Sequence, residues 1–63
     1  MNETQRQYAK WLEDLNLSDT TYNRNKFISE TIKSMIVFYG LYDTDIDYEK
    51  RILMNELTGV GYV

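Results

Sequence analysis

Three aspartates at alternate positions, Asp43, Asp45 and Asp47, have the spacing of the first ligands in a calcium-binding EF-hand loop. That loop also requires glycine at its sixth position for a sharp turn and glutamate at its twelfth position as a bidentate ligand. Tyr48 and Met54 occupy these two positions here. Because the turn and the last ligand are both missing, we expect no bound metal or other cofactor. We interpret the acids as charges that favour the start of a helix.

The side chains that most often perform catalysis are absent from the chain. It has no histidine and no cysteine, which removes the commonest general base, the best nucleophile and the usual zinc ligands. The remaining serines, lysines and carboxylates form no recognisable catalytic arrangement, and three short helices can hardly enclose a pocket of about 300 Å³. We therefore expect that the protein is not an enzyme.

The basic residues that cluster in the sequence are Arg24, Lys26 and Lys33. Lys26 and Lys33 share a helix face, but Glu30 lies between them, and ten acidic against seven basic residues give a net charge of −3. Neutralising a nucleic-acid backbone usually takes more positive charge than this. A small dimeric DNA-binding transcription regulator that uses these three residues is therefore the alternative hypothesis, and nucleic acid is the less favoured partner.

The aromatic residues point to a protein partner instead. The chain has six tyrosines, two phenylalanines and one tryptophan, and tyrosine is enriched in protein interfaces. Several tyrosines lie off the expected core, although they could equally cap a thin core. The predicted partner-binding residues combine aromatic and acidic side chains: Tyr42, Asp43, Asp45, Asp47, Tyr48 and Glu49. Their charge would complement a basic protein, such as one that itself binds DNA.

The hydrophobic pattern predicts an all-α fold of three short helices, over about 3–15, 19–39 and 45–58. Four apolar residues recur at helical spacing in the first helix: Tyr8, Trp11, Leu12 and Leu15. In the middle helix, Asp19 or Ser18 is the expected N-cap and Gly40 the expected end. The β-branched and aromatic run 36–39 also suits a strand, and the length of the segment favours helix there.

The middle helix has a wider apolar surface than one neighbour covers. Its predicted inner face is formed by five residues: Ile28, Ile32, Met35, Ile36 and Tyr39. A second stripe beside it, with one residue from the third helix, is the predicted dimer interface: Phe27, Thr31, Phe38 and Ile52. With 63 residues and no disulfide, the chain is short of core, and we expect it to gain stability as a homodimer.

The third helix is expected to place Ile46, Leu53 and Leu57 on its inner face, with Thr44 and Asp47 as a capping-box variant. We interpret residues 1–63 as a single domain with a frayed tail at 60–63. The chain lacks an apolar run of about 18 residues and a signal-like N-terminus, which favours a cytoplasmic protein without membrane contact.

These patterns favour a small acidic interaction module that binds another protein. By analogy of size and charge, it would be a phage- or mobile-element-like regulator that binds and modulates a host protein.

Overall fold

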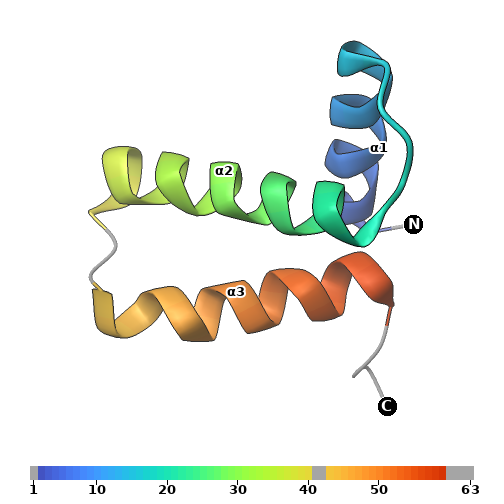
Figure 1. The fold of residues 1–63 in the computed structure, drawn as a ribbon. Helices are drawn as coiled ribbons and strands as arrows, with labels where there is room; N and C mark the ends of the chain where they lie inside the picture. The colour runs from blue at the N-terminus through green and yellow to red at the C-terminus, as the bar shows by residue number, and fades with distance from the viewer. Residues whose placement is uncertain (1, 41–42, 60–63) are drawn as a thin grey trace.

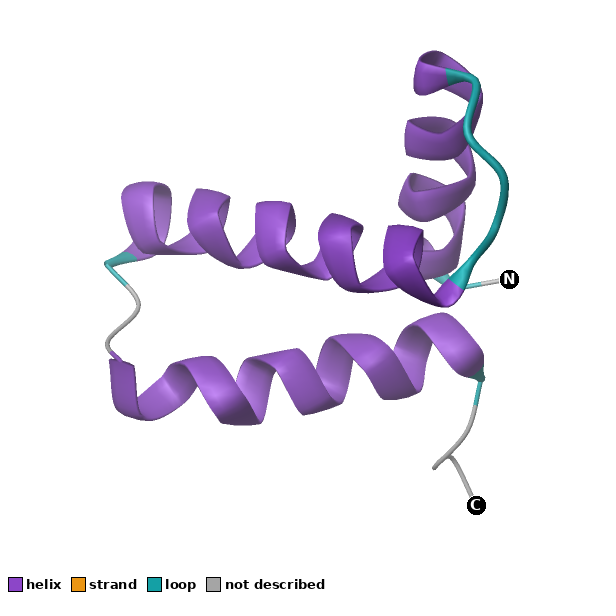
Figure 2. Ribbon diagram, viewed as in Figure 1, coloured by secondary structure: helices purple, strands orange, loops and turns teal. Residues whose placement is uncertain are grey.

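The structure is a computed structural model that describes residues 2–40 and 43–59. It contains three helices, α1 (Glu3–Leu15), α2 (Thr21–Tyr39) and α3 (Asp43–Thr58), and no strand among the described residues (Figure 2). The expected all-α fold of three packed helices is confirmed, and residues 36–39 belong to a helix. Two starts differ from the prediction: α2 begins at Thr21, and α3 begins at Asp43. The predicted frayed tail, 60–63, lies outside the described residues.

Local hydrogen bonds explain where the first two helices begin. Asn2 caps α1, because its side chain accepts a hydrogen bond from the Gln5 backbone N–H at 2.8 Å and the Gln5 side chain accepts one from the Asn2 backbone at 3.1 Å. Thr20 caps α2, because its hydroxyl accepts a hydrogen bond from the Asn23 N–H at 3.1 Å. The prediction that Asp19 or Ser18 caps α2 was therefore wrong.

Gly40 ends α2 as predicted. Its backbone has a φ of 64° in the left-handed region, where a residue without a Cβ is favoured. Its N–H donates to the Ile36 carbonyl at 3.2 Å. At the same end of the hairpin, α3 starts two residues before the expected Asp45, so Thr44 lies inside the helix and cannot be its cap.

Helices α2 and α3 run antiparallel and side by side, and α1 crosses them steeply at the end where α2 begins and α3 finishes (Figure 1). Polar contacts attach the start of α1 to the end of α3. The Asn2 side-chain amide donates to the Glu56 carbonyl at 2.8 Å, and the Thr4 hydroxyl donates to the Glu56 carboxylate at 2.6 Å. These contacts fix α1 at one end of the hairpin.

The core lies at this crossing. Among the residues whose burial the structure describes, five are no more than 7% exposed: Tyr8, Phe27, Ile28, Ile32 and Leu57. The Phe27 ring lies 5.2 Å from the Tyr8 ring and 5.5 Å from the Trp11 ring, measured between centroids. Six partly buried residues pack around this centre: Trp11, Leu12, Met35, Ile46, Leu53 and Met54. The inner positions predicted for Ile28, Ile32 and Leu57 are confirmed.

Three assignments on α2 need correction. Phe27 was predicted to contact a second copy, but Tyr8 and Trp11 of the same chain cover it. Ile36 and Tyr39 were predicted to be inner residues, but they are 40% and 82% exposed. α1 covers α2 at Phe27, and the last turn, which contains Ile36 and Tyr39, lies beyond this contact.

The two phenylalanines of α2 provide a matched test of this arrangement. Phe27→Ala should lower the free energy of unfolding by about 3–5 kcal/mol, because it removes a buried ring and leaves a cavity. Phe38→Ala should lower it by less than about 0.5 kcal/mol, because that ring is 76% exposed. Urea unfolding followed by circular dichroism measures both. Similar losses for the two variants would show that α1 does not cover α2 as described.

Candidate interaction surface

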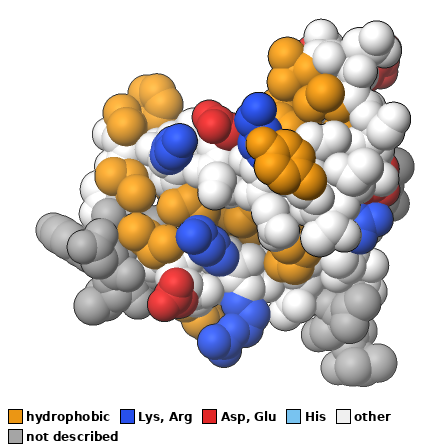
Figure 3. All heavy atoms as spheres, in the orientation of Figure 1, with side chains coloured by type: hydrophobic (Ala, Val, Ile, Leu, Met, Phe, Trp, Pro, Cys, Tyr) orange, Lys and Arg blue, Asp and Glu red, His pale blue; other side chains and the backbone are white. Residues whose placement is uncertain are grey.

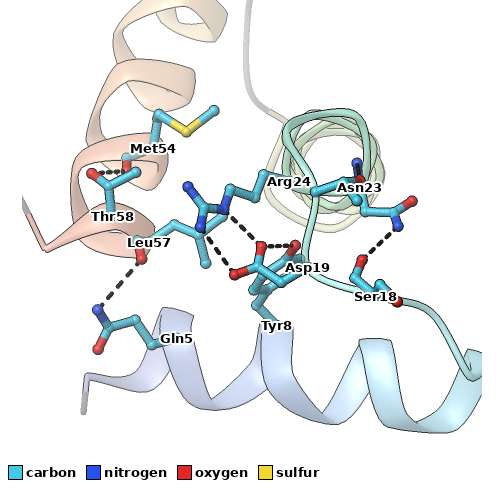
Figure 4. Close-up of polar contacts among 10 residues, drawn as sticks. Gln5, Tyr8, Ser18, Asp19, Asn23, Arg24, Met54, Leu57 and Thr58 are labelled. Carbon is cyan, nitrogen blue, oxygen red and sulfur yellow. Dashed lines mark hydrogen bonds and ion pairs between the residues drawn. The ribbon is translucent and has the colours of Figure 1, made fainter.

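A polar group joins α1 to the segment that precedes α2. The Asp19 carboxylate accepts a hydrogen bond from the Tyr8 hydroxyl at 2.8 Å, and it accepts bonds from Nε of Arg24 at 2.8 Å and from its terminal nitrogen at 2.9 Å (Figure 4). The ring of Tyr8 is buried, whereas its hydroxyl reaches this polar edge. The Asp19 carboxylate therefore bonds to one side chain of α1 and to one side chain of α2.

The charges of this group stabilise one another. Hydrogen bonds from Arg24, and then from Tyr8, lower the pKa of Asp19 from its ordinary value of 3.8 to about 2. Burial, together with the neighbouring Asp19 carboxylate, raises the pKa of the Tyr8 hydroxyl. The hydrogen bond to Asp19 raises the pKa of Arg24 further. None of these shifts brings a pKa closer to neutral pH. The three side chains are therefore suited to stabilising the fold and not to transferring protons.

A hollow of about 310 Å³ lies beside this group. Seven residues line it: Gln5, Tyr8, Ala9, Leu12, Asp19, Arg24 and Leu57. The hollow is open to solvent and is not an enclosed cavity. The two charged side chains that line the hollow, Asp19 and Arg24, form an ion pair with each other. Their charges are therefore already neutralised by an internal contact.

The basic residues proposed for nucleic acid are divided between two places. Arg24 is bonded to Asp19 at the junction with α1. Lys26 and Lys33 lie together on the outer face of α2, along a hollow of about 330 Å³. The Lys33 ammonium is 3.7 Å from the Glu30 carboxylate. The structure thus brings two of the three residues together and places an acid beside one of them.

The last turn of α2 is the most exposed apolar part of the described chain. Val37 and Phe38 are each 76% exposed, Tyr39 is 82% exposed and Ile36 is 40% exposed. Successive residues of a helix lie about 100° apart around its axis, so the turn is open over most of its circumference and is partly covered at Ile36. Figure 3 shows hydrophobic side chains gathered over this end of α2. We call Ile36, Val37, Phe38 and Tyr39 the α2 tip.

Helix geometry explains why Phe27 is covered and Phe38 is not. The two residues differ by only about 20° around the axis but by about 16 Å along it. A single helix is about 10–12 Å wide, and α1 crosses α2 at Phe27. Phe38 therefore lies beyond the width of α1.

The other predicted interface residues have mixed positions. Thr31 is half-buried, and its hydroxyl donates to the Phe27 carbonyl at 2.9 Å; Ile52 is also half-buried. Asp47 and Tyr48 are exposed on α3, and Glu49 is half-buried. Tyr42 and the side chains of Asp43 and Asp45 lie outside what the structure describes. Within the predicted dimer stripe, Phe38 is thus the large side chain with most of its surface open.

Comparison of the chain with protein-family models, curated proteins and solved structures found no match. Within 2–40 and 43–59, no helix combines the length and the apolar character that crossing a membrane requires. The same described residues contain no group of three or more acidic, histidine or cysteine side chains placed to hold a metal ion.

The low pKa of Asp19 predicts an acid-dependent contribution to stability. Because the pKa is lower in the folded chain than in the unfolded chain, the contribution is fully present above about pH 4 and is lost as the pH falls toward 2. Asp19→Asn should therefore be less stable than the wild type at pH 7, and the difference should shrink below pH 4. Urea midpoints at pH 7, 4 and 2 measure this.

Asp14→Asn is the matched control, since Asp14 is exposed on α1. Its difference from the wild type should change little over the same range. A pH-independent effect of Asp19→Asn would contradict the assigned role of the ionised carboxylate.

Proposed function

We propose that this protein acts by binding another protein through the α2 tip. The observation that carries the proposal is the exposure of Val37, Phe38 and Tyr39, each more than three-quarters open to solvent. Contiguous exposed apolar side chains lose contact with water when a partner covers them, at about 25 cal/mol per Å². Patches of this kind commonly mark protein interaction sites.

The α2 tip is also suited to serve as an anchor because it lies on a helix. Phe38 and Tyr39 have few side-chain rotamers, so their ordering on binding costs little conformational entropy. The helical bond from Gly40 to Ile36 closes the turn that carries them. An aromatic pair presented in this way is a typical centre for an interface.

A regulatory role fits these features better than a catalytic one. Asp19, which is the acidic residue bonded to Tyr8 and Arg24, is ionised and paired with Arg24, and the chain has neither histidine nor cysteine. We therefore favour a small phage- or mobile-element-like regulator that modulates a host protein by contact. The alternative, a DNA-binding regulator, is less favoured, since Arg24 is held by Asp19 and Lys33 lies beside Glu30.

Affinity capture from native cells tests the proposal with three forms of the protein. The wild type and Tyr22→Asp should retain similar amounts of the same partner. Phe38→Asp should retain about tenfold less or lower, because the substitution places a charge in the apolar anchor. Tyr22 is a matched control: it is 72% exposed and lies near the opposite end of α2.

Circular dichroism of each variant should show unchanged helix content, so that a loss of binding is not a loss of folding. Retention of the same proteins by the wild type and Phe38→Asp would contradict the α2 tip as the binding surface.

A further inference from the structure

We propose that a basic face of the hairpin binds an acidic segment of the partner protein. Four exposed side chains define this basic face: Lys26 and Lys33 of α2, and Lys50 and Arg51 of α3. The inference rests on the proposed function, because the basic face adjoins the α2 tip, and it specifies the chemistry of the partner.

Lys26 and Lys33 point away from both neighbours of α2. Around the helix axis they lie about 100° and 120° from Phe27, which α1 covers. They lie on the side of Phe27 opposite to buried Ile28. Both lysines are exposed, and 73% of the Lys33 side chain is open to solvent. Neither α1 nor α3 therefore covers this side of α2.

Lys50 and Arg51 extend the basic face to α3. Around the axis of α3 they lie about 120° and 140° from Glu56, whose carboxylate accepts the hydrogen bond from Thr4 of α1 at 2.6 Å. Both side chains are exposed. Figure 3 shows Lys and Arg side chains over both α2 and α3 on the face toward the viewer. Both helices of the hairpin thus contribute positive charge to a face that α1 leaves open.

The charge of the basic face is opposite to that of the whole chain. Among the described side chains, two acids, Glu30 and Asp47, lie with the four bases, which leaves an excess of positive charge. Glu49 lies about 20° from Glu56 around α3 and so belongs to the side that α1 contacts. A chain with a net charge of −3 therefore has a locally positive surface.

The hollow of about 330 Å³ along Lys26 and Lys33 is suited to a carboxylate. Five of its six lining side chains carry N–H or O–H donors: Tyr22, Asn25, Lys26, Ser29 and Lys33. None of the five forms a side-chain hydrogen bond with another residue that the structure describes. An ionised carboxylate only accepts hydrogen bonds, so an acidic side chain of the partner would complement these donors.

The amount of positive charge favours an acidic protein over nucleic acid. Strong binding to nucleic acid commonly involves about 6–10 phosphate contacts. The basic face has four basic side chains, and the Lys33 ammonium already lies 3.7 Å from Glu30.

The basic face also continues into the α2 tip. Val37 is 76% exposed, and it lies one turn after Lys33 and about 40° from it around the axis. A partner segment with acidic residues beside an apolar residue would contact both surfaces at once.

Two labelled peptides of about 14 residues test this inference. Both have leucine at the same positions, and the remaining positions are glutamate in one peptide and lysine in the other. Fluorescence anisotropy in about 50 mM salt should show that the glutamate peptide binds at least about tenfold more tightly, and its affinity should fall in about 500 mM salt.

The net charge of the chain alone would favour the lysine peptide. Equal binding of the two peptides, or tighter binding of the lysine peptide, would therefore overturn the inference. Tighter binding of a labelled DNA duplex than of the glutamate peptide would identify nucleic acid as the ligand and overturn it as well.

Paired variants locate the site on α2. Lys26→Gln combined with Lys33→Gln should weaken binding of the glutamate peptide by about fivefold or more. The control combines Arg6→Gln with Lys10→Gln, which changes the net charge equally at exposed positions of α1, and it should change the affinity by less than about twofold. Equal effects of the two pairs would show that only the net charge matters and would overturn the inference.

The same comparison applies to α3. Lys50→Gln combined with Arg51→Gln should also weaken the glutamate peptide severalfold, since both helices contribute to the basic face. Circular dichroism of every variant should show unchanged helix content. An unchanged affinity in this variant would remove α3 from the site and contradict the inference.

Glu30 provides a test in the opposite direction. Glu30→Gln should strengthen binding of the glutamate peptide by about two- to threefold, because it removes the acid beside Lys33. Glu13→Gln is the matched control, since Glu13 is exposed on α1, and it should have little effect. No gain from Glu30→Gln would show that the peptide does not bind at this hollow.

Affinity capture separates this inference from the proposed function. If the captured partner depends on Phe38 but on neither basic pair, the inference fails and the proposed function stands. If the glutamate peptide binds the basic face but no cellular partner depends on Phe38, the α2 tip fails as the binding surface and the basic face keeps its ligand.

Sedimentation tests whether the occupant is a second copy of this chain. A mass near 7.6 kDa is expected for the free chain. A mass twice as large that Lys26→Gln with Lys33→Gln abolishes would identify a second copy at the basic face and overturn the inference.

Discussion

The contact of Tyr8 and Trp11 with Phe27 is the interaction on which the rest of the structure depends. A hairpin of two helices has too little apolar surface facing inward to exclude water from both of its faces. α1 supplies the third layer, and it does so at one end of the hairpin. The buried residues gather at that crossing, and the exposed side chains of Val37, Phe38 and Tyr39 lie away from it.

The polar contacts around the crossing explain why α1 lies there. Its start is bonded to the end of α3 through Asn2 and Thr4, and its middle is bonded through Tyr8 to Asp19. Tyr8 joins the two kinds of contact, since its ring is in the core and its hydroxyl donates to a carboxylate that also binds Arg24. One side chain thus links the packing of α1 to the conformation of the segment before α2.

The sequence predicted the helices well because their signals are local. Apolar spacing and the terminal glycine of α2 act within a few residues, and the inner positions of Ile28, Ile32 and Leu57 follow from the same periodicity. Periodicity gives the direction of a side chain around a helix but not the place along the helix where a neighbour crosses. For this reason Phe27 was assigned to an interface and Tyr39 to the core. The prediction of Asp19 as the cap of α2 failed for a similar reason, because its carboxylate bonds to Tyr8, which is distant in sequence.

The candidate surface was only partly predictable for the same reason. Phe38 was identified from its stripe, whereas Val37 and Tyr39 were not, since their exposure depends on the limited width of α1. The uneven cover of α2 has a consequence for backbone dynamics. We expect amide protons near Phe27 to exchange only through unfolding of the whole chain, and those before Gly40 to exchange through local opening of the last turn. A ligand that covers this turn would slow that exchange, so binding and local order would be thermodynamically linked.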